Sequence, residues 1–101
     1  EFNTQNTGLT VSILYSDGFQ TRVEEIKTMM EQAGYVIACQ SITKDPHNQI
    51  ISHTYNATKK NAEYFKNRIP ELRKSQFIIS PDNYLCGKSD YTIVLSSKES
   101  Q

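Results

Sequence analysis

The feature that most constrains the fold is an apolar stripe of helical period that occurs twice. Apolar residues fall at i, i+3, i+7 and i+10 in each half of the chain, so a helix would gather them on one face. The residues of the two stripes are Val23, Ile26, Met30 and Ala33, and then Ala62, Phe65, Ile69 and Leu72. Each stripe needs an apolar surface to cover it, which predicts two helices packed on a common sheet.

Short runs of apolar and β-branched residues stand before and after each stripe and predict the strands of that sheet. The predicted strands cover residues 9–15, 35–39, 49–55, 76–80 and 91–95. Residues 35–39 are almost all apolar, as in a strand that is covered on both faces. The order β-α-β-β-α-β-β predicts an α+β fold. We expect a single sheet of four to five strands with two helices packed on one face, in two βαβ-like halves.

Turn and cap residues set the expected ends of these elements. Gly18 and Gly34 stand where positive φ angles are useful, in a turn and at a helix end. Thr21 and Glu24 have capping-box spacing for the first helix, with Asp17 as an alternative cap, and Asn56 is the expected cap of the second. Pro70 is expected to end that helix early, because it lacks an N–H donor.

The domain is expected to span residues 9–96. Residues 1–8 are polar and without a period, so they are predicted to be a disordered lead-in, and residues 97–101 a frayed tail. No apolar run approaches 18 residues, so no direct membrane insertion is expected from this fragment.

The charge balance limits the partners. The 101 residues include 11 Lys and Arg and 11 Asp and Glu, so the formal net charge is zero. A non-specific nucleic-acid binder needs a basic excess to displace counterions, so no nucleic-acid partner is expected. The strand at 50–55 also lacks the aromatic and basic pattern of RNA-recognition modules.

No constellation of catalytic residues stands out. Serine-hydrolase, zinc-protease, P-loop and dinucleotide-binding motifs are absent from the chain. His47 and His53 fall on a loop and a strand, and Asp17 and Asp82 would meet only if their loops shared one end of the sheet. We therefore expect no enzymatic activity, no cofactor and no metal site, with a small glycan- or phosphate-directed enzyme as the weakest alternative.

The cysteines leave two interpretations open. Cys39 and Cys86 lack the spacing of a zinc or redox motif. They could form a disulfide if the domain lies outside the cytoplasm, where such a loop closure contributes roughly 4 kcal/mol. Alternatively, Cys39 is a small core residue of a strand and Cys86 a loop thiol.

Tyrosine is the aromatic residue with a functional interpretation. Tyr15, Tyr55, Tyr84 and Tyr91 fall at strand ends or in loops, where tyrosine can stack on sugar rings or anchor a protein interface. Tyrosine also simply suits half-buried strands. The sheet face opposite the helices is expected to be partly exposed, with His53, Tyr55 and Tyr91 as candidates to lie on it, and exposed edge strands offer a further contact surface.

Three segments resemble the LytR C-terminal domain, the small module that follows the catalytic part of some LytR-CpsA-Psr cell-wall proteins. Residues 11–18 resemble its opening V-x-V-L-N-G-x-G, 33–37 its A-G-F-x-V, and 89–95 its closing A-D-V-T-V-V-L-G. Tyr15 and Ser16 stand where the family has Asn and Gly. The resemblance covers residues 9–96. Such a domain would be similar in architecture to SPOR-type glycan-binding modules, with two βαβ-like halves.

The resemblance implies a non-enzymatic module of the bacterial cell envelope. It would lie in the periplasm or elsewhere outside the cytoplasm, tethered through a missing N-terminal region. There it would bind peptidoglycan or another wall glycan, or dock on a wall-associated protein. The candidate ligand-binding residues are Tyr15, Asp17, Gly18, Tyr55 and Tyr91. The alternative is a protein-protein adaptor of an envelope secretion or pilus assembly, whose exposed sheet contacts a partner or a second copy of the chain.

Overall fold

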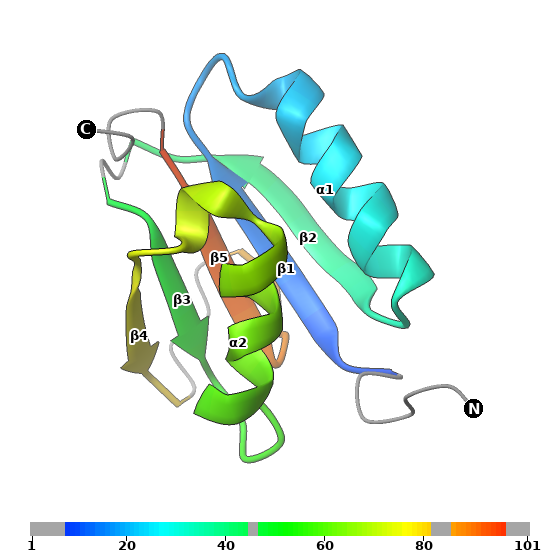
Figure 1. Ribbon diagram of the computed structural model, residues 1–101, viewed down its shortest axis with the longest axis vertical. Coiled ribbons are helices and arrows are strands. Elements are labelled where there is room, and N and C mark those ends of the chain that lie inside the picture. Colours follow the sequence, from blue (N-terminus) through cyan, green and yellow to red (C-terminus); the bar gives the residue numbers. More distant parts are fainter. Residues whose placement is uncertain (1–7, 45–46, 82–85, 97–101) are drawn as a thin grey trace.

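The computed structural model describes residues 8–44, 47–81 and 86–96 and confirms the predicted α+β fold (Figure 1). The strands are β1 (Thr10–Tyr15), β2 (Val36–Ile42), β3 (Gln49–Ser52), β4 (Gln76–Ile79) and β5 (Tyr91–Leu95). The helices are α1 (Gln20–Gln32) and α2 (Lys59–Arg68), and a 3-10 turn, η1 (Pro70–Leu72), follows α2. The element order is the one expected from the sequence.

The five strands form one mixed sheet in the order β2-β1-β5-β3-β4. Strand β1 is parallel to both β2 and β5, and β3 is parallel to β4 but antiparallel to β5. Each half of the chain is therefore a βαβ unit of adjacent parallel strands. The last strand, β5, lies in the centre and joins the two units.

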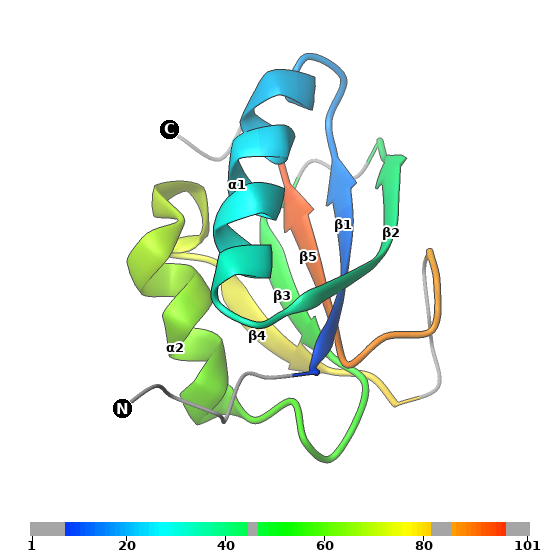
Figure 2. The same cartoon turned by 90° about the vertical axis from the view of Figure 1, so that its right-hand side faces the viewer.

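Both helices pack on the same side of the sheet, as predicted (Figure 2). The alternation of β1 and β5 sends Val11, Ile13, Tyr91 and Ile93 toward the helices, where they are fully buried with Phe65 of α2. Burying one such side chain is worth about 1.5–3 kcal/mol, so this layer is the main source of stability.

The second face of the sheet was expected to be partly exposed, and it is covered at its central strands. Thr92 and Val94 of β5 are fully buried there. The segment 86–90 runs along this side of the sheet (orange in Figure 2). It contacts β1 through the Ser12 hydroxyl, which lies 2.9 Å from the Ser89 hydroxyl oxygen and 3.2 Å from the Gly87 carbonyl oxygen.

Strand β2 is an edge strand, so the prediction that it is covered on both faces is wrong. Its apolar Val36 and Ile42 are 50% and 53% exposed. The register with β1 shifts where Val11 pairs with Ile37 but Ser12 pairs with Cys39, which leaves Ala38 as an extra residue. This bulge sends Ile37 toward the helices and Cys39 toward the opposite face, although they are two residues apart.

Two of the predicted helix caps are wrong. Helix α1 begins at Gln20, ahead of the proposed Thr21–Glu24 box, and no side chain caps it. Helix α2 is capped by Thr58 rather than Asn56, because strand β3 ends at Ser52 and a turn intervenes. The Thr58 hydroxyl oxygen accepts a hydrogen bond from the Asn61 N–H at 3.1 Å.

The strand predicted at 49–55 ends at Ser52, and the one predicted at 35–39 covers Val36–Ile42. The roles predicted for Gly18, Gly34 and Pro70 are confirmed. Gly18 and Gly34 have φ angles of 100° and 101°. Helix α2 ends at Arg68, two residues before Pro70. Of the predicted lead-in, Gly8 is ordered, since its N–H donates to the Gly34 carbonyl oxygen at 3.0 Å. Residues 1–7 and 97–101 lie outside the described residues.

Candidate functional site

Two of the tyrosines proposed to bind a ligand lie in the core. Tyr91 is fully buried, its ring packs edge-to-face on Phe65 with 4.9 Å between centroids, and its hydroxyl donates to the Thr58 carbonyl oxygen at 2.8 Å. Burial raises the pKa of the Tyr91 phenol to about 12, and the Asp90 carboxylate adds to the shift. Tyr15 is also buried in the helix-side core. Neither ring is available to stack on a sugar.

The remaining predicted site residues lie at opposite ends of the sheet. Strands β1 and β3 run in opposite directions, since β5 is parallel to one and antiparallel to the other. The exposed turn of Asp17 and Gly18, which follows β1, is therefore far from Tyr55, which follows β3. Gln20 holds this turn, because its side-chain oxygen accepts from the Gly18 N–H at 3.0 Å. Of the other candidates, Tyr84 and Asp82 lie outside the described residues.

His53 is a buried structural histidine and does not lie on an exposed face as expected. Its Nδ1 lies 2.8 Å from the Ser80 carbonyl oxygen, which can only accept, so Nδ1 carries the proton. Its Nε2 lies 2.8 Å from the Thr92 hydroxyl. The ring thus links the end of β3 to β5 and to the residue after β4.

The disulfide interpretation of the cysteines is confirmed. Cys39 and Cys86 are bonded, with 5.9 Å between their Cα atoms. The bulge at Ala38 is what turns Cys39 toward Cys86. The bond joins edge strand β2 to the segment that covers the second sheet face.

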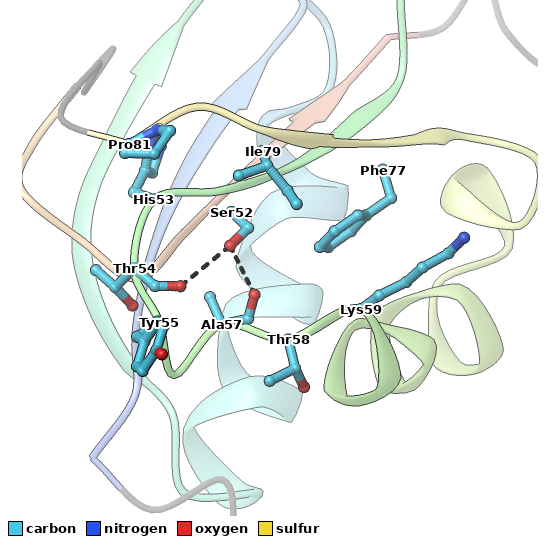
Figure 3. Close-up of a pocket in the computed structure, with 10 residues that line it drawn as sticks. All are labelled: Ser52, His53, Thr54, Tyr55, Ala57, Thr58, Lys59, Phe77, Ile79 and Pro81. Carbon is cyan, nitrogen blue, oxygen red and sulfur yellow. Dashed lines mark hydrogen bonds between the residues drawn. The ribbon is translucent and has the colours of Figure 1, made fainter.

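A cleft of about 590 Å³ lies at the end of β3, between the β3–α2 turn and β4 (Figure 3). This volume is in the range of small-molecule sites. The lining residues are Ser52, His53, Thr54, Tyr55, Ala57, Thr58, Lys59, Phe77, Ile79 and Pro81. The cleft is open to solvent, and Tyr55 is 99% exposed within it. The exposed Tyr55 ring and the 70% exposed Ile79 side chain give this concave, mostly apolar surface an accessible rim, which makes the cleft the candidate site.

Hydrogen bonds hold the turn that carries Tyr55. The Ser52 hydroxyl lies 2.6 Å from the Ala57 carbonyl oxygen and 3.3 Å from that of Thr54 (Figure 3). The Thr54 hydroxyl donates to the Asp90 carboxylate at 2.6 Å, and the other oxygen of that carboxylate accepts from the Thr10 N–H at 2.9 Å. The chain before Tyr55 is therefore linked through Asp90 to β1, and the chain after it is held by Ser52 of β3, so the turn that carries the ring is fixed at both ends.

One wall of the cleft is apolar, and the β3–α2 turn opposite it carries hydroxyl and carbonyl groups (Figure 3). Phe77 and Ile79 project from β4 between Tyr55 at one end and Lys59 at the other (Figure 3). Ile79 is 70% exposed. Ser52 and His53 are adjacent in sequence, but their side chains bond to different partners and make no nucleophile–base pair. Within residues 8–44, 47–81 and 86–96, no cluster of three His, Cys, Asp or Glu could hold a metal ion.

Tyr55 was predicted from the sequence as a binding residue, but most of the other residues that line this cleft were not. Thr58, Lys59, Phe77 and Ile79 come from two separate segments that only the β3–β4 pairing brings together. One sequence signal was available: the first turn of α2 has no acidic residue and begins with two lysines. This is the reverse of the charge that a helix N-terminus favours.

A second, polar hollow of about 340 Å³ lies at the other end of β3 and β4. It is lined by His47, Asn48, Gln49, Lys74 and Gln76. The Asn48 side-chain oxygen accepts from the Ser96 N–H at 2.6 Å, which gives this residue a structural role in fixing the end of β5. The hollow has no aromatic surface and is the weaker candidate.

None of the described helices is both long enough and apolar enough to cross a membrane. No protein-family model, curated protein or solved structure matches the chain. The resemblance to the LytR C-terminal domain therefore stays a prediction from the sequence.

Proposed function

We propose that this chain is a non-enzymatic module of the bacterial cell envelope that binds peptidoglycan or another wall glycan. The binding surface is the cleft beside the β3–α2 turn. The observation that carries the proposal is the fully exposed ring of Tyr55 at the end of a cleft with one apolar wall. Sugar rings have apolar C–H faces and polar edges, so they suit an aromatic platform with hydroxyl groups at its rim. Thr54 and Thr58 supply those hydroxyls.

The disulfide supports a location outside the cytoplasm. Such bonds persist in oxidising compartments and are rare where cellular thiols keep cysteines reduced. The Cys39–Cys86 bond suits a periplasmic or other extracytoplasmic domain. A small domain with 101 residues also gains more from a covalent link than a large one does.

Co-sedimentation with purified peptidoglycan sacculi tests the proposal. We expect retention of the folded chain that survives moderate salt, and a roughly tenfold weaker association for Tyr55→Ala, because one stacked ring is worth about 1–1.5 kcal/mol. Ile42→Ala is the matched control, since it removes an exposed apolar side chain from the opposite edge of the sheet.

Two results would contradict the proposal. If the wild-type chain stays in the supernatant at every salt concentration, it does not bind the glycan of the sacculi. Tyr55→Ala that sediments as well as Ile42→Ala would remove the cleft as the binding surface.

The alternative function is a protein-protein adaptor that acts through the edge strand β2. The observation that favours it is the pair of exposed apolar side chains, Val36 and Ile42, on a seven-residue edge strand. An extended peptide can add to such an edge. Capture of one purified envelope protein that is lost in Val36→Lys/Ile42→Lys but kept in Tyr55→Ala, without retention on sacculi, would select this function.

A further inference from the structure

The charge at the far end of the cleft narrows the class of glycan. Resting on the proposed function, we propose that the cleft selects glycans that carry a carboxylate group. One sugar ring stacks on Tyr55, and the carboxylate of the ligand pairs with the Lys59 ammonium group. The structure places these two residues at opposite ends of one continuous cleft (Figure 3).

The Lys59 ammonium group has no counter-charge in the described part of the protein. No carboxylate of residues 8–44, 47–81 and 86–96 lies within ion-pair distance of it. None of the residues that line the cleft is acidic. Lys59 also stands in the first turn of α2, where the helix dipole is positive and a lysine costs stability. An anionic group bound in the cleft would offset both effects.

Asp90, the acidic residue that binds the Tyr55 turn, already accepts hydrogen bonds within the protein. Asp90 accepts hydrogen bonds from the Thr54 hydroxyl at 2.6 Å and from the Thr10 N–H at 2.9 Å. Its carboxylate therefore serves the turn and does not compete with a ligand for Lys59.

The layout of the cleft suits a ligand longer than one sugar ring. Tyr55 and Lys59 lie at opposite ends, with Phe77 and Ile79 along the wall between them (Figure 3). A ligand with a second ring or a substituent can contact both ends. A neutral glycan of the same length would displace water from the ammonium group without giving it a partner, which is unfavourable.

A pair of disaccharides that differ in one carboxylate provides the test. N-acetylglucosaminyl-N-acetylmuramic acid carries a lactyl carboxylate, and N,N′-diacetylchitobiose is its neutral counterpart. We expect calorimetric titration of the full chain to show about fivefold tighter binding of the acidic disaccharide at low salt, the upper range for an exposed ion pair. Lys59→Gln should bring the affinities for the two disaccharides together, because it removes both the ion pair with the acidic ligand and the unpaired ammonium group that the neutral ligand covers.

Lys60→Gln is the matched control. It removes the same charge from the same helical turn, but Lys60 does not line the cleft. Equal loss of preference in both variants would overturn the assignment to Lys59. Equal affinity of the wild type for the two disaccharides, with both lost in Tyr55→Ala, would overturn the inference and leave the proposed function standing. Binding of neither disaccharide, together with no retention on sacculi, would remove both.

Discussion

Reduction of the Cys39–Cys86 disulfide is the perturbation with the largest expected effect on stability. The bond closes a loop with a sequence separation of 47 residues. Cross-linking a loop of this length removes chain entropy from the unfolded state worth about 4 kcal/mol at 25 °C. Small domains have a free energy of unfolding of about 5–15 kcal/mol in total, so reduction removes a large share of it.

Urea denaturation followed by far-ultraviolet circular dichroism measures this effect. With a slope of about 1.5 kcal/mol/M, the loss of about 4 kcal/mol lowers the midpoint by roughly 2.7 M in the presence of reductant. The thiols stay in place in the reduced chain, so the shift reports loop closure rather than lost packing. The variant Cys39→Ala/Cys86→Ala is the control, and its midpoint should not respond to reductant.

Two outcomes would refute this reasoning. Coincident urea midpoints for the oxidised and reduced wild type would mean that closing the loop does not reduce the conformational entropy of the unfolded state. Titration of two free thiols in the unfolded, unreduced chain would mean that the bond does not form.

Two further predictions concern single side chains. Tyr35→Phe should raise the free energy of unfolding by about 1 kcal/mol, because the buried Tyr35 hydroxyl has no hydrogen-bond partner among the described residues and burial raises its pKa; a lower melting temperature would contradict this. Arg22 of α1 binds Glu71 of η1 through two bonds of 2.8 and 3.0 Å, and this hydrogen bonding lowers the pKa of the Glu71 carboxyl in the folded state. The pair should therefore stabilise the protein above the ordinary carboxyl pKa of about 4.3, and this stabilisation should be lost as the pH falls through the lowered value. Glu71→Gln should lower the free energy of unfolding by about 1 kcal/mol at pH 7. The difference in unfolding free energy between this variant and the wild type should shrink below about pH 4. A difference that stays constant from pH 7 to pH 2.5 would show that the charge of Glu71 is not its origin.

Local patterns were sufficient to predict the elements of the fold. The strand at 91–95 was placed correctly, and each apolar stripe begins on a helix, because periods of two and 3.6 residues are properties of neighbouring residues. The last stripe residues, Ala33, Ile69 and Leu72, lie beyond the helix ends. Gly34 and Pro70 marked helix ends because of their own chemistry: glycine adopts positive φ angles, and proline lacks an N–H donor. The caps failed because Thr21 and Asn56 have the right chemistry for the role, but the chain enters each helix at another residue.

The candidate site was predicted only in part, because exposure depends on what packs against a residue. Tyr55 and Tyr91 both stand near a strand end, and the same chemistry was expected of both. Tyr91 begins the central strand and points toward α2, so Phe65 covers it. Tyr55 follows the end of β3, where the turn carries it away from the sheet. Only the pairing of β3 with β4 brings Phe77 and Ile79 beside it.

The amino-acid sequence by itself determined the α+β class, the order of the elements and the two cysteines that could bond. Tertiary structure decided that the last strand lies between the two halves, since strand pairing joins residues that are far apart in the chain. It also decided the disulfide, because a one-residue bulge at Ala38 reverses the face on which Cys39 lies. Side chains of a strand alternate with a period of two, so a single inserted residue moves a cysteine from the helix side to the side where Cys86 lies.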